Sequence, residues 1–221
     1  MIYISGLISL GIQFLIGIID YLAINIEVNL EDEILKDLIK VEFFVQIIEF
    51  IFYIWLIYYF SKKTRNITSF RYLDWSITTP LMLITLSAFL KHNRNEPFRL
   101  NDFVSNHQSS ILKIVFLNAA MLLFGFIGEI GLLNPYVSTT LGFIPFILNF
   151  KYIKDTFLQT SEDIYKNGLF YWFAFTWSLY GVFAVMSYTI KNTGYNILDV
   201  FSKNFFGIFL AYNIYLRRKT D

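Results

Sequence analysis

The chain has 221 residues, of which 56% are hydrophobic, 20% are aromatic and only 16% are charged. This composition is far more apolar than that of soluble domains and indicates a membrane protein. The net charge of +1 offers no basic surface to nucleic acid, so we expect no nucleic-acid partner. The sequence has no cysteine, and His92 and His107 lack the spacing of metal ligands. A disulfide scaffold and a thiol nucleophile are therefore excluded, and we expect no bound metal.

Seven apolar runs come close to the roughly 20 residues that a membrane-spanning helix needs. They are 3–25, 39–61, 69–90, 108–129, 135–153, 168–190 and 194–215. The connections are short, and the sequence contains no internal repeat or linker. We therefore predict an all-α, multi-pass integral membrane protein that forms a single seven-helix domain over residues 1–221, with the lipid bilayer around it.

The orientation follows from lysine and arginine, which gather in cytoplasmic loops. Placing the N-terminus outside and the C-terminus inside leaves the first loop and the basic C-terminal end, with Arg217 and Arg218, in the cytoplasm. The second loop, with Lys62, Lys63 and Arg65, then lies outside. The prediction rests on the first loop and the C-terminus.

The first connection, residues 29–40, is amphipathic. Its apolar side chains share one helical face and its acidic ones the other, the apolar set being Leu30, Ile34, Leu35, Leu38 and Ile39. Two interpretations remain open. The segment either lies in the membrane interface or extends the second helix into the cytoplasm.

Lys203 lies about midway along the last apolar run. A lone buried ammonium is costly, so such a lysine tends to be paired or to lose its proton. Asp199 lies four residues earlier on the same helical face, and Asp74 is central in the third run. A deprotonated lysine can condense with an aldehyde. The alternative is a cluster of charges that only locks helices together.

Four segments together resemble the microbial (type 1) rhodopsins. Residues 71–83, RYLDWSITTPLML, are similar to the signature of the family's third helix. Residues 121–129 are similar to the fourth helix of proteorhodopsins, residues 177–181 to the aromatic motif of the sixth helix, and residues 198–203 to the retinal-lysine helix. The resemblance covers the chain from the second helix onward.

This resemblance implies that all-trans retinal is joined to Lys203 as a protonated Schiff base, and that the protein is no enzyme. Asp74 and Asp199 would be the counter-ions, with Asp74 also the proton acceptor. Arg71 would lie between this pair and the outside as an extracellular gate. Thr78, one turn from Asp74, would hydrogen-bond that carboxylate.

The resemblance also implies a retinal pocket around Lys203, lined by Trp75, Thr79, Met82, Met121, Gly142, Phe146, Trp177, Tyr180 and Ser202. Two positions depart from the family's pattern. Gly181 stands where the sixth helix usually has a proline, so the kink there should be weaker. Ser202 places a hydroxyl directly before the lysine, and we expect it to shift absorption toward the blue.

The position at which outward proton pumps of this family usually carry an acid on the third helix is Thr85 here. A threonine cannot donate a proton at working pH. The second helix offers carboxyls instead, because Glu42, Gln46, Glu49 and Tyr53 share one face. The first helix presents a similar polar stripe of Ser9, Gln13 and Asp20.

These two stripes, joined by Asn204 beside the lysine, would line a hydrated path that favours cations. The pattern resembles the viral rhodopsins of giant algal viruses. It favours a light-gated cation channel, with Ser9, Glu49 and Asn204 as the central constriction and Glu42 in the cytoplasmic one.

The alternatives are an outward proton pump with Glu42 as proton donor, and a photosensor with a separate transducer. The translocated species would thus be cations or protons. A viral origin would place the protein in the membrane of an infected host cell. The aromatic stretch 50–55 would suit packing against a second copy of the chain, in a homo-oligomer.

Overall fold

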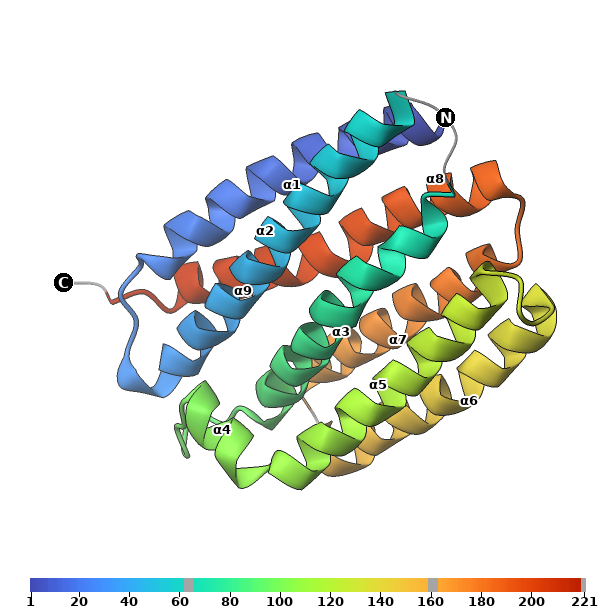
Figure 1. The fold of residues 1–221 in the computed structure, drawn as a ribbon. Coiled ribbons are helices and arrows are strands. Elements are labelled where there is room, and N and C mark those ends of the chain that lie inside the picture. The colour runs from blue at the N-terminus through green and yellow to red at the C-terminus, as the bar shows by residue number, and fades with distance from the viewer. Residues whose placement is uncertain (62–65, 159–162, 220–221) are drawn as a thin grey trace.

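The computed structural model describes residues 1–61, 66–158 and 163–219 (Figure 1). Lys62, Lys63 and Arg65, which entered the predicted orientation, lie outside the described residues. The helical segments are α1 (Ile2–Ile24), η1 (Leu30–Asp32), α2 (Glu33–Ser61), α3 (Thr68–Lys91), α4 (Leu100–Asn106), α5 (Gln108–Glu129), α6 (Pro135–Ile153), η2 (Lys154–Leu158), α7 (Ile164–Ala184), α8 (Tyr188–Asp199), η3 (Val200–Asn204) and α9 (Phe205–Leu216).

The long helices run side by side and form a closed bundle (Figure 1). Going round it, α1 packs on α2, α2 on α3, α3 on α5, α5 on α6, α6 on α7 and α7 on α8. α8, η3 and α9 follow one another without a break and together make the last long helix, which packs back onto α1. Counted in this way, the described residues form seven long helices, and the predicted all-α, seven-helix fold is confirmed.

The bundle buries polar side chains among the apolar ones of its core, and it exposes many large apolar side chains on its outside. Glu49 and Arg71 are fully buried, whereas Phe116 is 72% exposed and Leu112 is 69% exposed. In the described part of the chain, four helices are long and apolar enough to cross a membrane: Ile2–Ile24, Leu30–Tyr58, Thr68–Lys91 and Gln108–Glu129. An apolar outer surface around satisfied helical backbones is what lipid requires.

The predicted boundaries of the last two spans are wrong. Helix α7 ends at Ala184, and α8 already begins at Tyr188, whereas the apolar runs predicted spans over 168–190 and 194–215. Helix α8 carries several polar residues, and they include Asn192 and Asn196, whose side chains are fully buried in the bundle. A prediction from hydropathy leaves such polar residues out of a membrane span, although the interior of the bundle can bury them.

The first connection continues the second helix. After the short 3₁₀ turn η1, helix α2 runs without a break from Glu33. Ile34, Leu35, Leu38 and Ile39 belong to the buried core, and their side chains are at most 1% exposed. The apolar face from Ile34 to Ile39 therefore packs against the protein, whereas Leu30, in η1, is 75% exposed. The packing of this face agrees with the extension of the second helix and not with a separate interfacial helix.

Asp32 ties together the end of the bundle at which α1 and α2 are joined. Its buried carboxylate lies 2.8 Å from Nη1 of Arg217 and 3.1 Å from Nη2 of Arg94. His92 lies 3.7 Å away, but burial and the nearby charge of Arg217 lower the pKa of His92 to about 4. His92 is therefore neutral at pH 7, and the two arginines supply the ionic contacts.

Candidate functional site

Lys203 lies in η3, a π-helical segment inside the last long helix. Such segments are rare and often mark functional sites. The side chain is only 2% exposed, and its Nζ donates a hydrogen bond of 2.7 Å to Oδ2 of Asp74. Nζ also lies 3.4 Å from Oε1 of Glu49 and 4.0 Å from Oδ1 of Asp199. Three helices thus bring a carboxylate each to one buried amine.

The two predicted counter-ions differ in how they are held. Asp199 accepts hydrogen bonds from Tyr53 Oη at 2.7 Å, from Arg71 Nη1 at 3.1 Å and from Tyr180 Oη at 2.7 Å. These donors stabilise the charged carboxylate. Asp74 has Lys203 as its hydrogen-bond partner at Oδ2, and its Oδ1 is buried without one. Asp74 is therefore the carboxylate with room to take up a proton.

Arg71 closes the cluster on the side away from Lys203. Its Nε donates to Asn192 at 3.2 Å, its Nη1 to Asp199 at 3.1 Å and its Nη2 to Oδ1 of Asn196. Aromatic rings surround the guanidinium at 5.6–5.9 Å, namely Phe52, Tyr53 and Tyr195. A guanidinium with so many charge-assisted and aromatic contacts is fixed in place.

Glu49 belongs to the lysine cluster, although the sequence pattern placed it along an ion path. It is fully buried, and neither of its carboxylate oxygens has a hydrogen-bond partner. If every group were ionised, Lys203 and Arg71 would face three carboxylates, so the cluster would carry an excess negative charge. An unpartnered buried charge is costly, which makes Glu49 a group whose proton occupancy matters.

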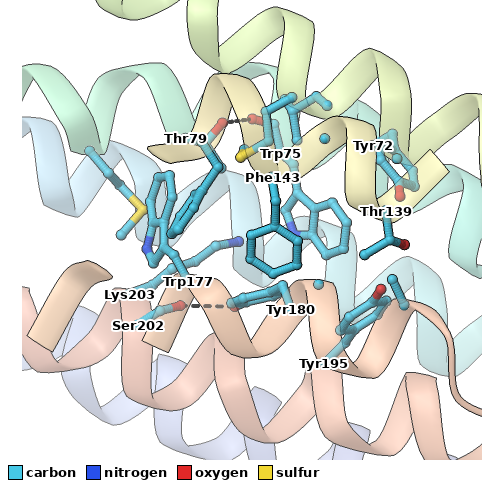
Figure 2. Close-up of a pocket in the computed structure, with 18 residues that line it drawn as sticks. Tyr72, Trp75, Thr79, Thr139, Phe143, Trp177, Tyr180, Tyr195, Ser202 and Lys203 are labelled. Carbon is cyan, nitrogen blue, oxygen red and sulfur yellow. Dashed lines mark hydrogen bonds between the residues drawn. The ribbon is translucent and has the colours of Figure 1, made fainter. Parts of the chain in front are cut away.

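A cavity that is open on one side lies beside Lys203. Every residue that the resemblance assigned to the retinal pocket lines it: Trp75, Thr79, Met82, Met121, Gly142, Phe146, Trp177, Tyr180, Ser202 and Lys203. Sequence reasoning missed other lining residues, namely Tyr72, Leu122, Gly125, Thr139, Phe143, Gly181, Ala184 and Tyr195. Figure 2 shows the amine of Lys203 pointing into this space among aromatic rings.

The cavity suits a long, flat, apolar ligand with an aldehyde at one end. Its walls are mostly aromatic and aliphatic, and Lys203 offers the amine that an aldehyde would condense with. Asp74 and Asp199 lie where a positive charge on that nitrogen would need them. The residues present therefore fit retinal.

Gly181 leaves room for a side chain of another helix. A Cβ at this position would lie 2.6 Å from two ring atoms of Phe143, so the ring of Phe143 rests on the bare backbone of α7. A proline would clash in the same place. The departure from the family's pattern is thus matched by a large side chain on α6, which fills the space and lines the cavity.

The predicted hydrogen bond from Thr78 to the Asp74 carboxylate is wrong. Thr78 Oγ1 donates to the backbone oxygen of Asp74 at 3.0 Å, as hydroxyls within helices commonly do. Thr79 likewise bonds to the backbone oxygen of Trp75 at 2.6 Å, and it accepts from Asn118 Nδ2 at 2.8 Å. Thr78 is fully buried next to the cluster, but its hydroxyl is used by its own helix.

The residues of the predicted ion path are all buried, and Gln46 and Asn204 hydrogen-bond each other. Ser9 Oγ donates to the backbone oxygen of Asn196 at 2.7 Å, toward Arg71. Gln46 Nε2 donates to Asn204 Oδ1 at 2.5 Å. The predicted constriction residues Ser9, Glu49 and Asn204 thus each have a different neighbour.

Glu42 meets the third helix at Thr85. Thr85 Oγ1 and Glu42 Oε1 are 2.5 Å apart, and both residues are at most 1% exposed. The carboxyl of the second helix therefore reaches the position at which the family's pumps usually place an acid from the third.

Comparison with known proteins agrees with this geometry. A family model described as bacteriorhodopsin-like protein matches residues 5–216. No curated protein matches the chain. Among solved structures, the viral rhodopsin OLPVRII aligns with a TM-score of 0.86 at 28% identity, over 97% of this chain and 98% of that one.

More distant rhodopsins share the fold. A blue light-absorbing proteorhodopsin from Med12 has a TM-score of 0.74 at 20% identity, covering 97% of each chain. The proton-pumping rhodopsin AR2 from the marine alga Acetabularia acetabulum has a TM-score of 0.73 at 18% identity, covering 98% of this chain and 96% of that one. The chain therefore belongs to the bacteriorhodopsin-like family of microbial rhodopsins, which are integral membrane proteins that bind retinal.

Proposed function

We propose that the protein is a light-driven outward proton pump with all-trans retinal on Lys203. When bound, retinal supplies the absorption of visible light and the isomerisation that moves the proton on Nζ. The chain's own residues then receive that proton on one side of Lys203 and replace it from the other. The contact between Glu42 and Thr85 carries this proposal.

Glu42 is the proposed proton donor. Its carboxyl is buried and hydrogen-bonded to Thr85 at 2.5 Å, so it is held in place and shielded from bulk water. A donor in this position needs a group that can lose a proton, and Thr85 itself cannot. The second helix thus supplies the carboxyl that the third helix lacks at this position.

Asp74 is the proposed acceptor. It lies 2.7 Å from Nζ of Lys203, within direct transfer distance, and its other oxygen has no partner. Asp199 is already engaged by three donors and serves better as the fixed counter-ion, which also anchors Arg71. With the N-terminus outside, as the basic residues predict, this order of proton transfers moves protons outward.

A cation channel is the second candidate. It is favoured by a file of buried polar atoms without hydrogen-bond partners along α1, α2 and η3, contributed by Gln13, Asp20, Gln46, Glu49 and Asn204. Such atoms are commonly satisfied by water, and a hydrated file would pass cations. The pump is preferred because Gln46 and Asn204 already hydrogen-bond each other, Ser9 bonds the backbone of Asn196, and Arg71 is held by Asn192 and Asp199.

Voltage-clamp recording from retinal-supplied cells tests the proposal. We expect an illuminated current that stays outward across the accessible voltages and is unchanged when the external cations are exchanged. A current that reverses near the cation equilibrium potential would instead establish the channel. Illumination that yields no current, in a protein that still absorbs visible light, would favour a photosensor.

Ser202 is expected to tune the colour. Its Oγ lies 2.8 Å from Tyr180 Oη, which donates to Asp199, so the serine belongs to the hydrogen-bonded network of a counter-ion. We expect Ser202→Ala to shift the absorption maximum toward the red. Ser178→Ala, whose hydroxyl bonds the backbone of its own helix at 2.7 Å, is the matched control. An unchanged spectrum in Ser202→Ala would refute the assignment.

A further inference from the structure

Asp20 on α1 is a buried carboxyl that the proposed pump does not yet use. Its side chain is fully buried, and neither of its oxygens has a hydrogen-bond partner. It lies against the last long helix at Gly207, where a Cβ would stand 2.8 Å from Oδ2 and 2.9 Å from Oδ1. The bare backbone of Gly207 therefore makes the room that this carboxyl occupies.

Gly207 is four residues after Lys203, about 6 Å along a helix axis. Asp20 thus lies about one turn from the lysine along this helix, and Asp74 lies on the third helix at the lysine itself. The charged groups that act on Glu42 are Asp20 from α1 and Lys203 from η3, and Thr85 of α3 supplies its hydrogen bond. The rings of Tyr21 on α1 and Phe43 on α2, next in sequence to the two carboxyls, have their centroids 6.1 Å apart, so the buried Asp20 and Glu42 lie at the same level of the bundle.

We propose that Asp20 is a second proton-binding carboxyl, electrostatically coupled to Glu42, which refills Glu42 after that residue has given up its proton. The proposal rests on the proposed pump and adds a residue to it. Two buried carboxyls close together do not both ionise readily, so the pair retains at least one proton.

The proton balance is simple. The carboxylic acid of Glu42 gives its proton toward Nζ of Lys203 and becomes a carboxylate. The acid of Asp20 then gives its proton to Glu42, through water in the polar file, and recovers one from the aqueous phase. No bond between heavy atoms forms or breaks. The unpartnered oxygens of Asp20 and the unpartnered Nδ2 of Asn204 are the groups that such water would bind.

Infrared spectroscopy of the dark, retinal-loaded protein tests the coupling directly, because protonated carboxyls have their own carbonyl band. The band is titrated with pH in the wild type, in Asp20→Asn, in Glu42→Gln and in the double variant. We expect each single variant to remove part of the band. We also expect Asp20→Asn to lower the midpoint of the remaining part, because the variant removes a negative charge that opposes the ionisation of Glu42. An identical titration of the remaining part in Asp20→Asn would overturn the proposal.

Kinetics give the second measurement. Asp20→Asn is expected to slow the reprotonation of Glu42, which follows the return of the proton to Nζ, by about tenfold, less than the roughly hundredfold or greater effect of losing a direct donor. Glu96→Gln, an exposed carboxyl on a loop, is the control and should change neither measurement. If Asp20→Asn does not fold, Gly207→Ala keeps the carboxyl but displaces it, and it should move the same band. An inward or reversing photocurrent with the band coupling intact would contradict the pump and not the coupling.

Discussion

Lys203→Ala is expected to abolish the absorption of visible light by the retinal-supplied protein. The variant removes the amine that an aldehyde would condense with, and the described residues place no other lysine on the cavity lining. Purification with retinal present, followed by an absorption spectrum, is the measurement. A coloured Lys203→Ala protein would contradict the assignment of the attachment site.

The matched control is Lys113→Ala. Lys113 lies on α5 with its Nζ 3.9 Å from the centre of the Tyr152 ring, away from the cavity lining. Its loss should leave the colour intact.

Stability gives an independent check on the charge cluster. Without Lys203, the carboxylates of Asp74, Asp199 and Glu49 face Arg71 alone, and breaking a buried ion pair typically costs about 3–5 kcal/mol. The double variant with Asp74→Asn should recover part of that loss. Thermal unfolding of the retinal-free proteins measures both effects.

Much of the cavity could be predicted from the sequence, because the motifs that resemble the rhodopsin family imply which residues line it. Trp75, Thr79 and Met82 follow one another at intervals of three or four on α3, and the structure places all of them on the cavity. Once a motif indicates which face of a helix points inward, it predicts all the lining residues on that face.

What the sequence could not give depends on contacts between helices. Phe143 and Gly181 complement each other across α6 and α7, and no spacing along either segment reveals that pairing. Glu49 was expected on an inward face, which is where it lies. Its 3.4 Å distance to Lys203 depends on the register between α2 and η3, and a π-helical turn shifts that register.

Hydrogen bonding within helices limited the prediction in another way. Thr78 was expected to bond the side chain of Asp74, one turn away, but its hydroxyl prefers the backbone oxygen at that same spacing. The sequence spacing is the same for both partners, so only the rotamer distinguishes them.

Glu42→Gln is expected to slow the return of the proton to Nζ of Lys203 by roughly 10²–10⁴-fold, the usual contribution of a positioned acid or base. Glutamine keeps the size of the side chain and can still hydrogen-bond to Thr85, which lies 2.5 Å from Oε1 in the wild type. Its amide is not acidic, so it cannot donate a proton at working pH. Time-resolved absorption after a light flash measures the rate.

Two controls separate a lost donor from a damaged fold. Glu31→Gln changes an exposed carboxylate that pairs with Arg94 at 3.2 Å, and it should leave the rate unchanged. A small diffusible weak acid should restore the rate in Glu42→Gln, because it carries protons to the same place. If Glu42→Gln returns the proton at the wild-type rate and changes only the conductance, Glu42 lines a pore. The contact with Thr85 would then serve cation passage and not proton transfer.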